Sequence, residues 1–216
     1  MKLDAVVIGE AALGLLDEVG LDGLTMRKVA GALNVQAPAL YWHVKNKREL
    51  LDVMARAVFV EAVSGVEAPR RGVTWQDWIA ELAGRLRGAM LRHRDGGRLL
   101  AGTYVSDESM WRTMELTLRT VEDAGFAPVD AGRVFPIVLH YTTGFVIEEQ
   151  ARSGADYGDD NPYAHIEQSV DADRFPRTAH LVTSLFAAEP NAEFDHGLRV
   201  ILAGISALAA VDRECR

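Results

Sequence analysis

The sequence predicts an all-α protein, with a small N-terminal unit of three helices followed by a larger helical domain. Three observations support this prediction. Apolar residues recur at the three- and four-residue spacing of amphipathic helices along nearly the whole chain. No segment shows the alternating pattern of a half-buried strand, and there is no internal repeat. With 216 residues, 49% of them hydrophobic, the chain can bury a substantial core.

The first two helices are expected at the N-terminus, before a tight turn. A helix over residues 4–19 should end at Gly20. Thr25 is a favourable N-cap for a short second helix, and Asn34 can adopt the left-handed conformation that the turn to the next helix requires. The inward faces of the two helices are predicted to consist of Ile8, Ala12, Leu15, Leu16, Val19, Val29, Ala30 and Leu33.

The third and fourth helices follow directly. Pro38 fits the first turn of a helix over residues 36–43, because its missing N–H costs nothing there. Asn46 and Glu49 form an Asn-x-x-Glu capping pair. This pair should open a long fourth helix that ends near residue 63.

Residues 65–72 (GVEAPRRG) read as a linker, and the larger domain follows it. Its helices are expected at residues 75–90, 107–124, 128–152, 177–188 and 192–211. The first of these should stop at the turn His93-Arg94-Asp95-Gly96-Gly97, and Pro136 should kink the third. Residues 153–176 are acidic and poorly periodic, so we expect a loop with at most short helical pieces.

Apolar spacing also predicts the inward faces of two of these helices. In the helix over residues 107–124 the inward residues should be Met110, Met114, Leu118 and Val121. In the helix over residues 192–211 they should be Phe194, Leu198, Ile201, Leu202, Ile205 and Leu208.

Cysteine content and hydropathy limit the classes to which the protein can belong. Cys215 is the only cysteine, so an internal disulfide is impossible and a secreted disulfide scaffold is excluded. The N-terminus lacks the basic and apolar regions of a signal peptide, and no segment offers about 18 uncharged apolar residues. We therefore expect a cytoplasmic protein with no membrane partner.

The net charge of −8 is unevenly distributed along the chain. Residues 1–50 hold equal numbers of acidic and basic side chains, so the excess negative charge lies beyond them. Within this segment the basic side chains are concentrated in two places, residues 27–28 and residues 45–48. The acidic balance of the whole chain therefore does not exclude a nucleic-acid partner for the N-terminal unit.

Residues 36–50 read QAPALYWHVKNKREL and place three ring-bearing residues just before a basic cluster. Two short helices joined by a tight turn can present the second helix to the major groove of DNA. The small side chains of Ala37, Pro38 and Ala39 would let this helix approach the bases. Tyr41, Trp42 and His43 could lie against sugars and donate to phosphates, Lys47 could hold the backbone, and Arg27 could reach a guanine edge.

An ordinary structural role for these residues was weighed against DNA binding. A Tyr-Trp-His run is more often part of a core, and a group of Lys and Arg is usually a solvated face. Consecutive helical residues lie about 100° apart, however, so three rings in succession cannot all point inward. We therefore expect at least one of the three to be exposed.

The run GLDGLTMRKVAGALNVQAPALYWHVKNKRELLD resembles the DNA-binding domain of the tetracycline repressor (TetR) family. The resemblance continues through TWQDW, LRHRDGGRLLAGT, AGF and TTGFVIEEQ, so it covers most of the chain. It implies a homodimeric, ligand-responsive transcriptional repressor that binds double-stranded operator DNA. It also implies three parts: a helix-turn-helix DNA-binding domain (1–47), a connecting helix (48–64), and an effector-binding and dimerisation domain (65–216).

The resemblance also implies roles for individual residues of the DNA-binding domain. Base contacts, or contacts with base methyl groups, are expected from Arg27, Gln36, Ala37, Pro38 and Tyr41. Trp42, His43 and Lys47 would hold the DNA backbone or the orientation of the domain.

The same resemblance argues against tetracycline as the effector. In the tetracycline-binding members of the family, a histidine after the HRDG turn binds the magnesium ion of the drug chelate. This sequence has Leu100 there, and a leucine cannot ligate magnesium. Leu82 and Leu86 replace polar residues that grip the drug. We therefore expect a small, largely apolar or aromatic effector and no metal or cofactor.

An effector cavity should be lined mostly by apolar side chains, although many of these could instead pack the core. The candidate apolar residues are Trp75, Trp78, Leu82, Leu86, Met90, Leu100, Tyr104, Met110, Met114, Phe135, Leu139 and Phe145. The candidate polar anchors are Thr103, His140 and Glu148, which match positions around the metal site of the tetracycline-binding members.

Two-fold symmetry should place the recognition helices of a dimer about one DNA turn, roughly 34 Å, apart. The helices over residues 128–152 and 192–211 are the best candidates for an intermolecular four-helix bundle. Small residues at Ala203, Gly204, Ser206 and Ala207 would allow close approach. The fourth helix joins the two domains, so we expect it to transmit movement from the effector-binding domain to the DNA-binding domain.

Three alternative functions remain: an enzyme, a transcriptional activator and a ligand-independent DNA-binding protein. His93-Arg94-Asp95 is reminiscent of a kinase catalytic loop but lacks the other kinase motifs, and His140 with Glu148 and Glu149 lacks further metal ligands, so catalysis is not expected. A transcriptional activator would need the same operator binding as a repressor. A ligand-independent DNA-binding protein of the same fold should lack a cavity.

Overall fold

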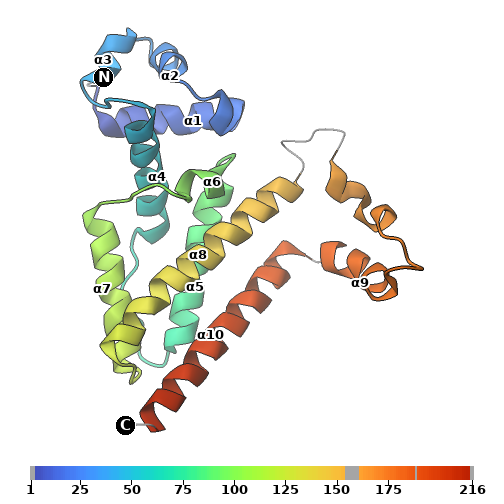
Figure 1. Cartoon of the computed structure of the whole chain (residues 1–216). Helices are drawn as coiled ribbons and strands as arrows, with labels where there is room; N and C mark the ends of the chain where they lie inside the picture. The colour runs from blue at the N-terminus through green and yellow to red at the C-terminus, as the bar shows by residue number, and fades with distance from the viewer. Residues whose placement is uncertain (1–2, 154–160, 188, 215–216) are drawn as a thin grey trace.

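The computed structural model describes residues 3–153, 161–187 and 189–214. Within these ranges the chain is all-α, as predicted, with ten α-helices and no strand. Helices α1 to α3 form a small unit at one end of the molecule, and α4 leads from it into a bundle formed by α5, α7 and α8 (Figure 1). The DNA-binding candidates therefore lie at one end, well separated from the bundle.

Helix α1 (Ala5–Gly23) begins where the sequence predicts. The carboxylate of Asp4 accepts hydrogen bonds from two backbone amides of its first turn, both at 3.0 Å. Gly20 has a left-handed φ of 68°, so the regular helix is interrupted there and one further turn follows. The predicted stop signal is thus present, although the element continues to Gly23.

Helices α2 (Met26–Ala32) and α3 (Ala37–Tyr41) enclose the predicted tight turn. The Thr25 hydroxyl caps α2 by accepting from a backbone amide at 3.3 Å. Asn34 has a φ of 53°, as the turn requires. Helix α3 is shorter than the predicted span of residues 36–43, because the two residues after Tyr41 form a turn.

Helix α4 (Lys47–Val63) is capped by the predicted Asn-x-x-Glu pair, with one difference. The side chain of Asn46 accepts from the Glu49 amide at 2.9 Å. The Glu49 carboxylate accepts from the amide of Lys45, at 2.7 Å, rather than from that of the cap residue. Both interactions fix the path of the chain between the third and fourth helices.

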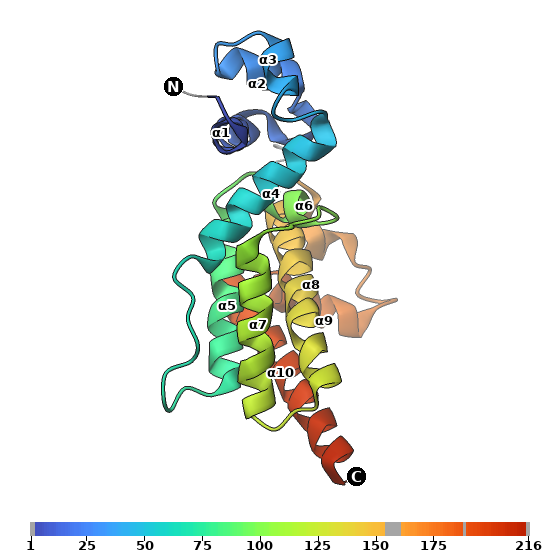
Figure 2. The ribbon, with the colours of Figure 1, turned by 90° about the vertical axis from the view of Figure 1, so that its left-hand side faces the viewer.

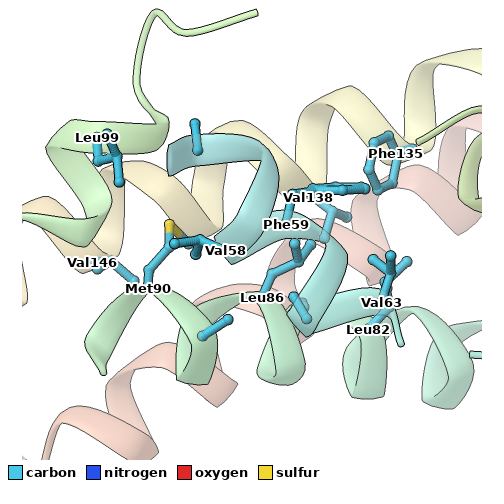
Figure 3. Close-up of a cluster of buried hydrophobic side chains, with 14 of the residues drawn as sticks. Val58, Phe59, Val63, Leu82, Leu86, Met90, Leu99, Phe135, Val138 and Val146 are labelled. Carbon is cyan, nitrogen blue, oxygen red and sulfur yellow. The ribbon is translucent and has the colours of Figure 1, made fainter. Parts of the chain in front are cut away.

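The second half of α4 is part of the core of the larger domain. It packs against α5 (Trp75–Leu91), α6 (Gly96–Leu100) and α7 (Glu108–Asp123), as Figure 2 shows from the side. The side chains that fill this space are Val58, Phe59, Val63, Leu82, Leu86, Met90, Leu99, Phe135, Val138 and Val146, all at most 5% exposed (Figure 3). Helix α6 was not predicted from apolar spacing.

The buried face of α7 differs from the prediction. Met110, Met114 and Leu118 are only half-buried, and Val121 is fully buried. The fully buried positions are otherwise threonines: Thr113, Thr117 and Thr120. The Thr117 hydroxyl donates to the Thr113 carbonyl oxygen at 2.8 Å, which lets a polar side chain enter the core.

Helix α8 (Pro128–Arg152) crosses the bundle, and its backbone stays helical through Pro136. A 3₁₀ helix (Pro162–Ser169) and α9 (Pro176–Ala187) pack on each other and project from the bundle (Figure 1). Residues 153–176 are thus a loop with a short helical piece, as expected, in the part that is described.

Helix α10 (Pro190–Glu214) packs along α8. Phe194, Leu198 and Leu202 are buried, as predicted, and Ile201 and Ile205 are half-buried. Leu208 is 69% exposed, so its predicted inward position is wrong for the single chain. None of the described helices has both the length and the apolar character of a membrane span.

Candidate DNA-binding surface and effector cavities

The end of α3 forms an exposed aromatic surface. Leu40 is completely buried and anchors the helix, whereas Tyr41 is 48% exposed and Trp42 is 89% exposed. His43 is exposed as well. The expectation that at least one ring must face solvent is therefore confirmed, and all three rings do so.

The other candidate DNA contacts lie on the same unit. Arg27, Gln36 and Pro38 are exposed, and Ala37 is half-buried at the start of α3. Lys47 is exposed at the start of α4, where its ammonium donates to the Leu21 carbonyl oxygen at 3.2 Å. The eight predicted residues thus come from α2, from α3 and the residues that flank it, and from the first turn of α4.

Arg48 takes part in a different interaction. Its guanidinium donates to the carbonyl oxygen of Gly102 at 2.6 Å and pairs with Asp52 at 3.5 Å. Asp52 in turn accepts from the amide of Tyr104 at 3.4 Å. The first two turns of α4 are therefore bonded to the loop that follows α6.

A second junction joins α1 to the start of α6 through a buried carboxylate. Asp95 is 7% exposed, has a φ of 60° and lies in the HRDG turn. One of its oxygens accepts from the backbone amide of Leu21 at 2.7 Å. The other oxygen accepts from Arg98 at 3.0 Å, and Arg98 also reaches Asp22 of α1 at 3.2 Å. Sequence reasoning treated this segment only as a turn and missed the junction.

Two further features bring α1 close to the turn before α6. The carboxylate of Asp17 accepts from the backbone amide of Arg94 at 2.9 Å and lies 3.4 Å from the His93 ring. A Cβ atom on Gly20 would come within 3.1 to 3.2 Å of the side chains of Arg94 and Asp95. The absence of a side chain at Gly20 therefore permits this close approach as well as its left-handed backbone.

The first candidate effector cavity, of about 520 Å³, lies between α4, α7, α8 and the loop after α6. Five predicted residues line it: Leu100, Thr103, Met110, Leu139 and His140. Phe59, Val105, Thr143, Gly144 and Ile147 complete most of its wall. The Thr103 hydroxyl is within 3.0 Å of the carbonyl oxygens of Leu99 and Leu100. The cavity is therefore largely apolar, with few free polar groups.

The second cavity, of about 430 Å³, lies between α8 and the start of α10. Three predicted residues line it: His140, Phe145 and Glu148. Arg87 lies behind its wall, where it makes a bidentate ion pair with Glu149, at 2.6 and 2.8 Å, and donates to Asn191 at 2.7 Å. His140 and Gly144 border both cavities.

The remaining predicted cavity residues do not join these two sites. Leu86, Met90 and Phe135 are buried in the core (Figure 3). Trp78 and Leu82 border a separate cavity of about 450 Å³ at the linker, where the Trp78 indole N–H donates to the Glu67 carbonyl oxygen at 2.8 Å. Buried apolar residues at helical spacing fill a core as readily as a cavity.

Three more predicted residues lie outside the described cavities. Met114 is half-buried on α7. Trp75 packs its ring edge-on against Phe126, with centroids 5.1 Å apart. Tyr104 is 67% exposed on the loop after α6.

The cavity walls do not suit a magnesium ion. Leu100 lines the first cavity and offers only hydrocarbon, and His140 and Glu148 share only the second cavity. Among the described residues, no group of three or more His, Cys, Asp or Glu side chains is placed to hold a metal ion. The side chains at hand therefore do not fit the metal chelate that the tetracycline-binding members recognise.

A third surface runs along α8 and α10. Ile137 is 42% exposed, Val200 59% and Leu208 69%, so apolar side chains of both helices face outward. A groove of about 250 Å³ lies between the two helices and is bordered by Ile137, Ile205 and Leu208. Exposed apolar residues that gather on two neighbouring helices are typical of an interface with another protein.

Comparisons with known proteins agree with this arrangement. Residues 8–54 match the family model "Bacterial regulatory proteins, tetR family", and residues 68–209 match "Tetracyclin repressor-like, C-terminal domain". Tetracycline repressor protein class A from transposon 1721 of Escherichia coli is 39% identical over 99% of this chain and 95% of its own length.

Two solved structures have the same fold. A possible TetR family transcriptional regulator from Streptomyces coelicolor A3(2) has a TM-score of 0.86 and 35% identity, covering 95% of this chain and all of the other. The TetR family protein ActR from Streptomyces coelicolor, in complex with (S)-DNPA, has a TM-score of 0.80 and 30% identity, covering 97% and 100%.

Proposed function

The chain belongs to the TetR family of bacterial regulatory proteins, and we propose that it is a homodimeric repressor which a small molecule other than tetracycline releases from its operator. Its relatives are transcriptional regulators, and we propose no catalytic role. A protein that binds operator DNA in a bacterium acts in the cytoplasm.

The exposed end of α3 carries the DNA-binding part of the proposal. A tryptophan that is 89% exposed, beside a half-exposed tyrosine, contributes nothing to the core of the single chain. They lie at the C-terminal end of α3, whose N-cap residue makes no side-chain hydrogen bond, and Lys47 supplies an exposed cation at the start of α4. Aromatic rings and amide or ammonium donors in this order suit the sugars and phosphates that flank a major groove.

The two cavities support a small-molecule effector. Leu100 and its neighbours present an apolar wall, so an apolar or aromatic molecule would gain free energy by displacing water there. A ligand-independent DNA-binding protein would have no need of such a space. The absence of a metal ligand at Leu100 argues against a tetracycline–magnesium chelate.

Dimerisation would bury the outward apolar face of α8 and α10. Gly204 has no atom within 4 Å of its would-be Cβ, and Ala203 and Ala207 are exposed, so a second copy could approach the α10 backbone closely. A four-helix bundle formed by α8 and α10 of two copies would fix the distance between the two α3 helices.

Two junctions are placed to couple effector and DNA. The loop after α6 lines the first cavity and is bonded to Arg48 and Asp52 of α4. The start of α6 is bonded to α1 through Asp95. An effector that binds more tightly when this loop is in a different position would shift the equilibrium between the DNA-binding and the released conformation. The free energy of this shift cannot exceed the difference in the effector's binding free energy for the two conformations.

The test is fluorescence anisotropy of the purified protein on the DNA upstream of its own gene, at several salt concentrations. We expect tight binding that weakens steeply with salt, because Lys and Arg displace counterions from the phosphates. The Tyr41→Ala variant should lose most of the specific binding.

Trp111→Ala is the matched control, because Trp111 is also an exposed aromatic residue (53%) but lies on α7. It should bind the operator as the unaltered protein does. If the protein preferred no sequence in a selection from random DNA, or if both variants behaved alike, the proposed function would be wrong.

A further inference from the structure

Gly144 lies where the two effector cavities meet. It borders both, and a Cβ atom built on it would have no atom within 4 Å. His140, one turn earlier on α8, also borders both cavities. Gly144 is exposed, so the lack of a side chain there leaves open space on α8 where the apolar first cavity adjoins the second.

The second cavity differs from the first in its charge. Glu148, Glu149 and Glu193 line it, with Arg152 as the one arginine of its described wall. Arg87 neutralises Glu149 through the bidentate ion pair. Within the described part of the chain, Glu148 and Glu193 have no side-chain hydrogen bond or ion pair, so their carboxylates are free to meet a ligand.

Aromatic rings stand directly beside these carboxylates. Tyr141 and Phe145 line the second cavity and pack on each other and on Phe194, with ring centroids 5.3 to 5.9 Å apart. The Arg87 guanidinium lies 5.7 Å from the centre of the Phe145 ring and 5.1 Å from that of Phe194. This cluster of rings and carboxylates thus already holds one organic cation of the protein itself.

The pKa of Tyr141 reflects both its burial and the carboxylates near it. Burial raises the pKa of its hydroxyl above the ordinary value, and the carboxylates of Glu193 and Asp195 raise it further, against the opposing effect of Arg87. Of these causes, the carboxylates of Glu193 and Asp195 would also favour a cation, whereas burial opposes any charge.

We propose that the two cavities form one elongated effector site, whose ligand places a flat apolar body in the first cavity and a protonated amine beside Glu148 and Glu193 in the second. The proposal rests on the proposed function, in that it takes these cavities to be the effector site. It goes beyond an apolar effector by specifying a cation and its position.

The test compares three anthracene derivatives of similar size and different charge: anthracen-9-ylmethylamine, anthracen-9-ylmethanol and anthracene-9-carboxylate. Dissociation constants would be measured by fluorescence titration on the full chain at pH 7, with EDTA present to remove metal ions. We expect the amine to bind about fivefold more tightly than the alcohol, and the carboxylate to bind most weakly, as for a partly exposed ion pair.

Substitutions then locate the two halves of the site. Glu148→Gln and Glu193→Gln should each reduce or abolish the preference for the amine and leave the alcohol within twofold. Glu122→Gln, on the exposed end of α7, is the control and should change neither. Gly144→Leu should weaken all three ligands at least tenfold by filling the space where the two cavities adjoin, whereas Gly84→Leu, at another open helical glycine, should not.

The proposal is overturned if none of the three compounds binds, if the alcohol or carboxylate binds as tightly as the amine, or if Gly144→Leu has no effect. A preference that appears only when magnesium replaces EDTA would indicate a metal-bridged ligand and would also overturn it. Operator binding by the ligand-free protein is measured separately, so the proposed function can stand where this inference fails.

Discussion

Asp95 is a buried carboxylate that holds two domains together. It accepts one hydrogen bond from the backbone of α1 and one from Arg98, and its backbone is left-handed. Asparagine tolerates the same backbone conformation, so Asp95→Asn removes the charge with little change of shape. Loss of a charged hydrogen bond at a buried site typically costs about 1–3 kcal/mol.

We therefore expect Asp95→Asn to lower the free energy of unfolding by about 1–3 kcal/mol, measured by urea denaturation. Asp22→Asn is the control, because the Asp22 side chain is 87% exposed and pairs with the same Arg98. It should cost less than about 1 kcal/mol. Equal effects of the two substitutions would contradict the role assigned to burial.

Tyr141 makes the stability dependent on alkaline pH. Its pKa is raised in the folded chain, so the stability that it contributes is complete below the ordinary pKa of about 10 and is lost as pH rises through the folded value. At pH 8, Tyr141→Phe should cost about 0.5–1.5 kcal/mol, because it removes the hydrogen bond to the Phe194 carbonyl oxygen.

Urea unfolding from pH 8 to pH 11 checks this expectation. The difference in unfolding free energy between the unaltered chain and Tyr141→Phe should shrink above pH 10. A difference that stays constant across the range would mean that the hydroxyl does not titrate differently in the folded and unfolded chains.

Several single residues could be predicted from sequence because their chemistry is local. Thr25, Asn34 and Asn46 act on backbone groups within three residues, and the structure places all three as predicted. Asp95 could not be predicted in the same way, because its partner amide lies 74 residues away. A buried acidic residue has no local signal that distinguishes it from one in an exposed turn.

At the scale of elements, α8 and α10 depend on a close approach at Gly197. A Cβ atom there would collide with the Tyr141 hydroxyl oxygen, and the Tyr141 ring packs against both Phe145 and Phe194. Gly197→Ala should therefore lower the unfolding free energy by about 1–3 kcal/mol, as overpacking commonly does.

Gly14→Ala is the matched change on α1, where the added methyl meets no atom within 4 Å. It should raise the unfolding free energy by about 0.5–1 kcal/mol, because alanine is the better helix former. Thermal and urea unfolding of both variants test the pair. A stabilising Gly197→Ala would show that the two helices can separate without cost.

Prediction from sequence was less successful where several elements meet. Helix α6 has only five residues and begins with two glycines, so it has no amphipathic period to detect. On α7 the hydroxyls of Thr113 and Thr117 donate to carbonyl groups of their own helix, which hides their polarity from the core. Met110 faces a cavity instead, and a thioether side chain suits either position.

At the scale of the whole molecule, the outward face of α8 and α10 predicts a dimer. Leu208→Glu and Val200→Glu would place charges in an apolar interface and should dissociate the dimer, seen as a change from two chains to one in sedimentation velocity. Operator affinity should fall when the dimer dissociates, because each half-site would then be bound by a separate chain.

Val73→Glu is the control for this prediction, since Val73 is 42% exposed on the linker before α5. It should leave both the mass in solution and the operator affinity unchanged. A dimer that survives both substitutions on α10 would place the interface on another face of the chain.

The way α4 is shared between the two domains sets a rule for protein engineers. Val53 packs on Gly9 of α1, whereas Phe59 and Val63 lie in the core of the larger domain. A chimera that takes its DNA-binding domain from another repressor should therefore be joined inside this helix, near residue 55, and not in a loop. The donor should also keep acidic side chains that match Asp17 and Asp22, because both contact the larger domain beside α6.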